Sequence, residues 1–182
     1  LDPEEYLSFE VGAKLLWKDK ASLQLALFHT EIDDQIKRFR TGQIIDGDFE
    51  IQKANVGDGS LHGVEVSGTY DLPHNVQLFG SFAWLEGRVD NFIGDNRLKT
   101  TEPIGRMLPA NGTVGARWKS EDGKFWLEGY LRIVDDQDRL STANQNDTTR
   151  IPPGGTPGYT IINLRGQWNV NEHLEISLAV EN

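Results

Sequence analysis

Arginine residues are the groups in this sequence whose chemistry points most directly to a bound ligand. Arg97, Arg106, Arg139 and Arg150 fall in or beside long polar stretches of the chain. The planar guanidinium group forms paired hydrogen bonds with carboxylates and phosphates, which suits it to anionic chelates. We therefore predict these four arginines as ligand-binding residues. The alternative is that each one is a solvated loop charge or part of a surface salt bridge.

Other kinds of site chemistry find little support in the sequence. There is no cysteine, which excludes disulfides and thiolate metal sites. The four histidines show no metal-ligand spacing, so we predict no metal site and no cofactor. No two glutamates are paired as a glycosidase requires, and we predict that the chain is not an enzyme. With 18 basic and 28 acidic residues, the net charge of −10 argues against a nucleic-acid partner.

Period-two alternation is the dominant signal along the chain, and no segment holds a good helical period. Four short turns centre near residues 19, 74, 122 and 171, and long polar stretches at about 33–59, 87–111 and 135–157 separate the hairpins. We predict an all-β fold of about eight antiparallel, up-and-down strands, with the long polar stretches as loops. The expected strands are 6–17, 21–32, 61–72, 76–86, two in the hairpin 112–133, 159–168 and 173–181.

The predicted strands match the thickness of a bilayer. They run about 10 to 12 residues, longer than the usual ~5–6 and close to the ~9–11 that cross a membrane in a barrel. No apolar run approaches the ~20 residues of a transmembrane helix. The strand before each short turn ends in an aromatic residue on its apolar face: Trp17, Tyr70, Trp118 and Trp168. Four rings at one level are typical of the aromatic girdle of a transmembrane barrel.

The two faces of each strand therefore have predicted environments. We expect apolar residues to face lipid and charged residues to face the lumen, because a lipid-facing charge at mid-membrane is costly. The outward set is Trp17, Val66, Trp118, Leu127, Leu131 and Leu178, and the inward set is Glu65, Arg117, Glu128, Arg132 and Glu175. A soluble antiparallel sheet with one solvated face would alternate in the same way.

Several stretches of the sequence resemble the C-terminal barrel portion of TonB-dependent outer-membrane receptors. The order and spacing of these stretches, more than any one of them, carry the resemblance. They are EEYLSFEVGAK, ASLQLALFHTEIDDQI, NVGDGSLHGVEVSGTYDLPHNVQLFGSFAWLEG, DRLS, TRIPPGGTPGYTIINLRGQW and HLEISLAVEN.

The resemblance implies a portion of a barrel of about 22 strands with a plugged lumen, located in the bacterial outer membrane. It implies active uptake of a scarce small-molecule ligand such as a ferric siderophore. The implied partners are outer-membrane lipid, the protein's own N-terminal plug domain and, through that plug, the TonB complex. We expect residues 1–182 to form one partial barrel domain, with the plug and the last strand outside this stretch. A soluble β-sandwich or barrel binding module, and a small self-contained outer-membrane barrel acting as an adhesin or anchor, remain as alternatives.

Overall fold

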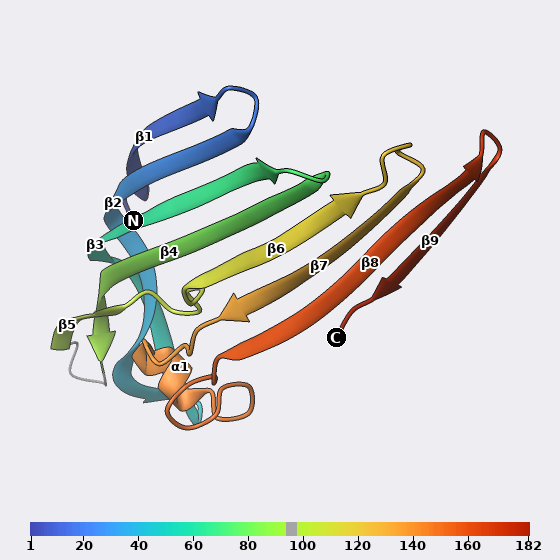
Figure 1. Cartoon of the computed structure of the whole chain (residues 1–182). Coiled ribbons are helices and arrows are strands. Elements are labelled where there is room, and N and C mark those ends of the chain that lie inside the picture. The colour runs from blue at the N-terminus through green and yellow to red at the C-terminus, as the bar shows by residue number, and fades with distance from the viewer. Residues whose placement is uncertain (94–97) are drawn as a thin grey trace.

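A single curved, antiparallel sheet dominates the computed structural model, which describes residues 1–93 and 98–182 (Figure 1). The strands follow one another across the sheet in the order β1-β2-β3-β4-β6-β7-β8-β9, and β5 pairs with β4. The elements are β1 (Glu5–Trp17), β2 (Ala21–Ile45), β3 (Asp48–Leu72), β4 (Val76–Ile93), β5 (Leu98–Pro103), β6 (Asn111–Lys119), β7 (Phe125–Val134), α1 (Thr142–Asn146), β8 (Tyr159–Asn171) and β9 (Leu174–Val180).

The predicted up-and-down, antiparallel order of the strands is confirmed, with one strand more than expected. The additional strand is β5, which pairs with the end of β4. The ladder runs from the pair of Arg88 and Pro103 to the pair of Ile93 and Leu98. It lies in the stretch 87–111 that we predicted as a loop. That prediction was wrong for this part because the buried residue of β5 is Glu102, a carboxylate, so the segment lacks the apolar alternation that marks a strand in the sequence.

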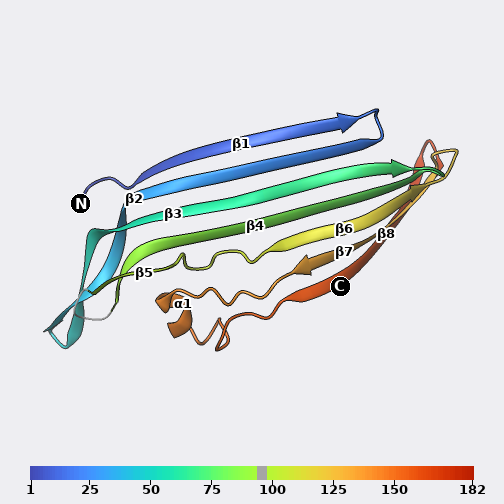
Figure 2. The same cartoon turned by 60° about the vertical axis from the view of Figure 1, so that its left-hand side comes forward.

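The prediction of a loop at 33–59 was also wrong, because β2 and β3 continue far beyond the sheet that they share with their neighbours. Each strand is 25 residues long. They meet at Asp46 and Gly47, whose φ angles of 53° and 93° form the tight turn that an Asp-Gly pair favours. Register shifts after Ile32 and after Arg40 interrupt the ladder. The two-stranded ribbon bends away from the sheet at these irregularities (Figure 2).

All four short turns lie at one end of the sheet, as predicted (Figure 2). In the first of them Lys18 and Asp19 have φ angles of 45° and 54°, and the N–H of Lys20 donates to the carbonyl of Trp17 at 2.8 Å. This left-handed geometry matches the twist of the flanking strands and keeps the connection short. The ribbon, β5 and α1 gather at the opposite end. Among the described residues, no helix is long and apolar enough to cross a bilayer.

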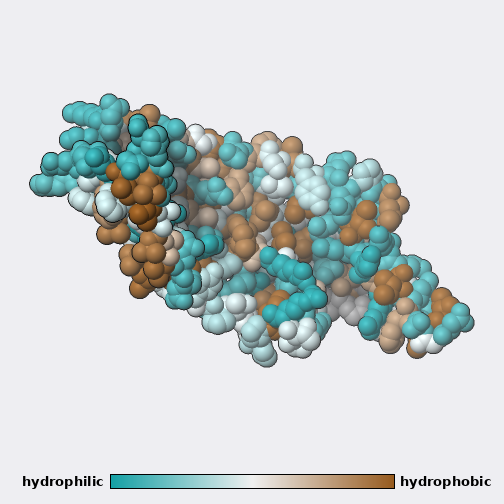
Figure 3. Space-filling view, turned by 90° about the vertical axis from the view of Figure 1, so that its right-hand side faces the viewer, coloured by the Kyte–Doolittle hydropathy of each residue, from teal (hydrophilic) through white to brown (hydrophobic). Residues whose placement is uncertain are grey.

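One face of the sheet carries the predicted row of aromatic side chains. The ladder pairs Trp17 with Ala21, Tyr70 with Leu78, Trp118 with Leu127, and Trp168 with Ile176, which sets all eight residues on one face. The four rings are 42% to 70% exposed. One end of the molecule is strongly hydrophilic and a hydrophobic patch lies directly beside it (Figure 3). Exposed rings in a row fit a face that meets lipid rather than water.

A small hydrophobic core forms beyond the aromatic face, where the ribbon bends. Ile32, Phe39, Val56, Val89 and Met107 are all less than 9% exposed. The rings of Phe39 and Phe92 meet edge to face with their centres 5.4 Å apart. A two-stranded ribbon is only marginally stable by itself, so this packing holds it at the end of the sheet.

Replacing Leu131 by Arg tests the assignment of the aromatic face, because Leu131 pairs with Val114 on that face and lies four residues beyond the level of Trp118 and Leu127. In the full-length protein we expect Leu131→Arg to lower the yield of assembled barrel, since a lipid-facing arginine near the bilayer midplane costs about 2–4 kcal/mol. The control is Ser67→Arg in β3, which adds the same charge on the face of the sheet opposite to the aromatic face. Heat-modifiable gel mobility reports assembly. Equal loss in both variants, or loss in Ser67→Arg alone, would contradict the assignment.

Candidate functional site

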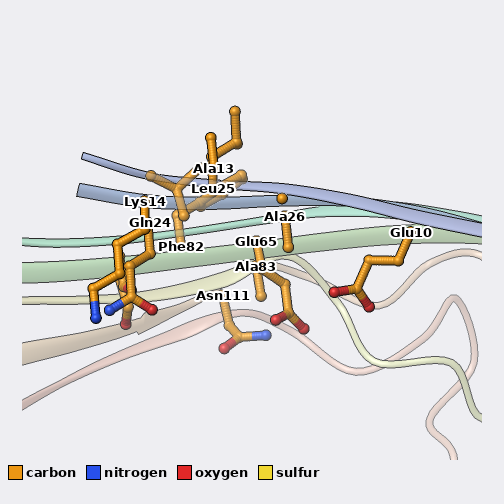
Figure 4. A pocket seen from close by; sticks show the side chains of 14 residues that line it. Glu10, Ala13, Lys14, Gln24, Leu25, Ala26, Glu65, Phe82, Ala83 and Asn111 are labelled. Atoms are coloured by element: carbon orange, nitrogen blue, oxygen red, sulfur yellow. The ribbon is translucent and has the colours of Figure 1, made fainter.

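The concave face of the sheet is polar and hollowed where β1 to β4 cross it. The hollow has a volume of about 600 Å³. Glu10, Glu65 and Asn111 project to the concave side, whereas Ala13 and Leu25 point to the opposite side (Figure 4). The ladder places Arg117, Glu128, Arg132 and Glu175 on the same face as Glu65. These positions agree with the predicted inward set, and we call this concave surface the lumen face.

An ion cluster on the lumen face ties three strands together. Glu128 is 2% exposed and lies between two arginines. Its Oε2 accepts from Nε of Arg117 at 2.7 Å, and its Oε1 accepts from Nε of Arg165 at 2.5 Å. Arg117 also stacks over Trp126 at 4.8 Å, and Arg165 over Tyr130 at 5.3 Å. Both oxygens of Glu128 are therefore paired, and the cluster acts as a clamp across β6, β7 and β8.

A second cavity, which we call the mouth pocket, lies at the end of the lumen face that is remote from the short turns. It has a volume of about 370 Å³ and is built from segment 106–111, the end of β7, loop 135–157 and the start of β8. Arg106, Arg132 and Arg139 contribute to its lining together with Asp135 and Tyr159. Three cations against one carboxylate make this pocket suitable for an anionic group.

Loop 135–157 is held in place mainly by hydrogen bonds to backbone. The amide of Gln137 donates to the carbonyl of Met107. The guanidinium of Arg139 donates from Nη1 to the carbonyl of Leu85 at 2.8 Å and from Nη2 to the carbonyl of Leu108 at 3.4 Å. Arg139 thus joins the loop to β4 and to the segment before β6. These contacts indicate that Arg139 determines the shape of the pocket by fixing the position of the loop.

The short helix α1 is anchored by a carboxylate from a distant strand. Glu102 of β5 is 8% exposed, and its Oε2 accepts from the N–H of Thr142 at 2.7 Å. The amide of Asn91 donates to the other oxygen at 2.7 Å. Burial alone would raise the pKa of Glu102, but the hydrogen bonds from Thr142 and Asn91, with the nearby Lys37, outweigh burial and hold the pKa below its usual value. Glu102 is therefore ionised at neutral pH.

The helix in turn positions a second arginine of the pocket. The N-cap residue Ser141 accepts from the N–H of Asn144, and Oδ1 of Asn144 accepts from the backbone N–H of Arg106 at 3.0 Å. Arg106 has a φ of 60°, and its side chain reaches Asp147 at 3.7 Å. The series of hydrogen bonds from Glu102 through α1 thus determines the position of Arg106.

The structure brings together some of the arginines predicted to bind ligand. Arg106 and Arg139 line the mouth pocket, whereas Arg150 is not part of its lining. Arg150 is 73% exposed and shares the carboxylate of Asp147 with Arg106, at 3.4 Å. Arg97 lies outside the described residues.

Arg132 is the pocket residue that sequence reasoning did not select as a ligand contact. We predicted it only as lumen-facing, from the alternation in β7. It lines the mouth pocket, and no described residue forms an ion pair or hydrogen bond with its side chain. Its place beside loop 135–157 depends on long-range pairing, so the sequence alone gave no signal for this role.

Comparison with known proteins decides the family. The profile described as "TonB dependent receptor-like, beta-barrel" matches residues 1–182. The chain belongs to the TonB-dependent receptor β-barrel family. Members of this family are transporters of Gram-negative outer membranes rather than enzymes. For this receptor barrel, the predicted fold class and the family resemblance are confirmed.

Solved structures show the same fold at low sequence identity. The copper transporter OprC is 19% identical with a TM-score of 0.72, over 99% of this chain and 25% of that chain. The ferric-catecholate import receptor Fiu from E. coli K12 is 18% identical with a TM-score of 0.66, over 100% and 23%. The FrpB iron transporter from Neisseria meningitidis is 14% identical with a TM-score of 0.71, over 98% and 26%. This chain spans about a quarter of each of these proteins.

A partial match to an enzyme carries no functional assignment. A 3-phosphoshikimate 1-carboxyvinyltransferase of Desulfitobacterium hafniense is 30% identical over 104 residues, which is 55% of this chain and 22% of that enzyme. Because the match omits nearly half of this chain and most of the enzyme, it defines neither a fold nor an activity for the receptor barrel.

Neutralising Glu128 tests the clamp on the lumen face. In the full-length receptor we expect Glu128→Gln to destabilise the barrel by about 1–3 kcal/mol, because Arg117 and Arg165 lose their shared carboxylate while remaining partly solvated. Glu65→Gln is the matched control, since no described residue pairs with that carboxylate. The midpoint of urea unfolding in lipid or detergent measures both. Equal midpoints for the two variants would contradict the role of the clamp.

Acid should release α1 through Glu102. Because the folded-state pKa of Glu102 is lowered, its stabilisation is complete above the unfolded value of ~4.3 and is lost as pH falls through the lower folded value. We expect the amide protection factors of residues 141–147, which correct for the intrinsic pH dependence of exchange, to fall below about pH 4, and to be lowered already at neutral pH in Glu102→Gln. Asp122→Asn, in a short turn at the other end, is the control. Exchange in 141–147 that is unchanged in Glu102→Gln would exclude this anchoring.

Proposed function

We propose that this chain forms part of the wall of an outer-membrane receptor that takes up a scarce, anionic small molecule such as a ferric siderophore. The uptake is driven by the TonB complex acting on a plug domain that lies outside residues 1–182. The single observation that carries the proposal is the mouth pocket of a receptor barrel, with Arg132 unpaired among the described residues and Arg106 beside it. A pocket with excess positive charge favours an anionic chelate over a neutral or cationic ligand.

The proposed roles of the arginines follow from their contacts. Arg132 and Arg106 meet the anionic groups of the ligand, because both residues line the cavity. Arg139 positions loop 135–157 through its two carbonyl contacts. Arg150 helps neutralise Asp147, which would otherwise weaken the attraction of Arg106 for an anion. Arg97 remains a predicted ligand residue on the basis of the sequence.

The proposed transport cycle uses the wall as a fixed frame. The ligand binds at the mouth while the plug closes the lumen, and the TonB complex displaces the plug to open a path along the lumen face. The clamp at Glu128 stiffens β6, β7 and β8 while the plug moves. Metal cargo is common to the descriptions of the structural relatives, as a ferric catecholate for Fiu, iron for FrpB and copper for OprC, which supports a metal chelate as the ligand class.

Uptake measurements test the ligand class and the pocket together. In cells that depend on the full-length receptor, we expect Arg132→Gln to weaken binding of a ferric catecholate by about 10- to 100-fold, the equivalent of one charged hydrogen bond of ~1.5–3 kcal/mol. Arg88→Gln is the control, because Arg88 is exposed on the opposite face at the same end. Uptake of ⁵⁵Fe-labelled complex and binding to purified receptor are the readouts.

Two results would contradict different parts of the proposal. Iron uptake that persists unchanged when the receptor gene is deleted would exclude ferric siderophores as the ligand. Binding that falls equally in Arg132→Gln and Arg88→Gln would exclude the mouth pocket as the ligand site.

A further inference from the structure

The ribbon formed by the outer parts of β2 and β3 has two faces of different character. One face carries the buried side chains of Phe39 and Val56, and the Phe39 ring packs against Phe92 of β4. The ladder pairs Arg38 with Lys53, Arg40 with Ile51, and Ile44 with Phe49, which places these six residues together on the opposite face. We call this set of six residues the ribbon face.

The ribbon face exposes apolar side chains where lipid does not account for them. Ile44, Phe49 and Ile51 are 64%, 52% and 60% exposed. The ribbon begins where the ladders with the neighbouring strands end, at Asp33 for β1 and at Gly59 for β4. It therefore projects from the end of the sheet remote from the short turns (Figure 2). Grouped apolar residues outside the lipid band indicate an interaction surface.

The charge of the ribbon face is positive although the chain as a whole is strongly acidic. Arg38, Arg40 and Lys53 lie on it, and the guanidinium of Arg40 stacks over the Phe49 ring at 4.4 Å. None of the six described residues that form the ribbon face carries a carboxylate. Asp48 and Glu50 alternate with Phe49 and Ile51 and so belong to the other face, where Glu50 accepts from Thr41 at 2.5 Å. In a chain of net charge −10, this separation favours an acidic partner.

The shape of the ribbon indicates what kind of partner fits. Small-molecule sites are concave, whereas one face of a two-stranded ribbon has no enclosing wall. Within the described ranges, residues 37–45 of β2 pair only with β3, and residues 48–57 of β3 pair only with β2. Both edges therefore offer backbone groups that an extended segment can join by strand addition.

We propose that the ribbon face is a docking site for an extended, acidic segment of another protein, whose apolar side chains contact Ile44, Phe49 and Ile51 and whose carboxylates pair with Arg38, Arg40 and Lys53. This surface is separate from the mouth pocket and serves protein recognition rather than passage of the transported molecule.

A defined peptide probe tests the proposal on the full-length receptor in detergent. The probe is a fluorescent ten-residue peptide of alternating glutamate and valine, compared with one of alternating lysine and valine. Fluorescence anisotropy measures affinity at low and moderate salt. We expect the glutamate peptide alone to bind, and the triple variant Arg38→Glu/Arg40→Glu/Lys53→Glu to weaken its binding at least tenfold.

Two further variants separate the apolar and the nonspecific contributions. Ile44→Ser/Phe49→Ser/Ile51→Ser should also weaken binding by about tenfold or more, because the apolar contacts are lost while the cations stay. The control Lys18→Glu/Lys20→Glu/Lys124→Glu makes the same charge change at the short turns and should bind the peptide within twofold of the unmodified receptor. Heat-modifiable mobility confirms that every variant is assembled.

Three outcomes would overturn the proposal. The first is equal peptide binding in all variants. The second is a preference for vesicles of anionic phospholipid over the peptide, which would assign the ribbon face to a lipid surface. The third is failure of Ile51→Cys to react with a membrane-impermeant maleimide on intact cells, which would show that other parts of the receptor cover this face.

Discussion

The register between neighbouring strands is the constraint on which the rest of this structure depends. Within a bilayer every backbone N–H and C=O must be hydrogen-bonded inside the protein, so the ladders cannot slip without moving each side chain to the opposite face. The observed register brings Trp118 opposite Leu127 and, one residue away, Arg117 opposite Glu128. A shift by one residue would send the buried ion cluster toward lipid. The lipid face and the lumen face are thus fixed by a single pairing pattern.

The same pairing explains why the functional residues lie where they do. Glu128 ties β6, β7 and β8 on the lumen face, and two positions further along β7 toward the mouth pocket Tyr130 stacks with Arg165. A further two positions bring Arg132 to the pocket. Beyond the lipid band the constraint relaxes. There, hydrogen bonds from polar side chains hold the loops in place. Glu102 accepts from the first N–H of α1, and Arg139 donates to the carbonyls of Leu85 and Leu108.

The sequence alone predicted the parts of the fold that local alternation controls. Strand order, the common end of the short turns and the aromatic row all follow from side chains that alternate within one strand. The ribbon was missed because polar residues such as Lys37 and Gln52 hide alternation when both faces meet water or a small core. One local signal was present, since Asp46–Gly47 stands between Ile44 and Phe49, a strong hairpin pattern. The pocket role of Arg132 and the anchoring of α1 by Glu102 could not be predicted, because they depend on residues that are distant in sequence.

The central claim is that the charged concave face lines the lumen. A measurement of the side-chain environment along β7 tests this claim most directly. Single cysteines at Leu127, Gly129 and Leu131, and at Tyr130 and Arg132, would be spin-labelled in the full-length receptor in lipid bilayers. The account predicts that collisions with oxygen dominate at the first three positions and collisions with a water-soluble nickel complex at the last two. Equal accessibility to oxygen and nickel at all five positions would contradict the account. So would the reverse pattern, with nickel collisions dominant at the first three positions and oxygen collisions at the last two.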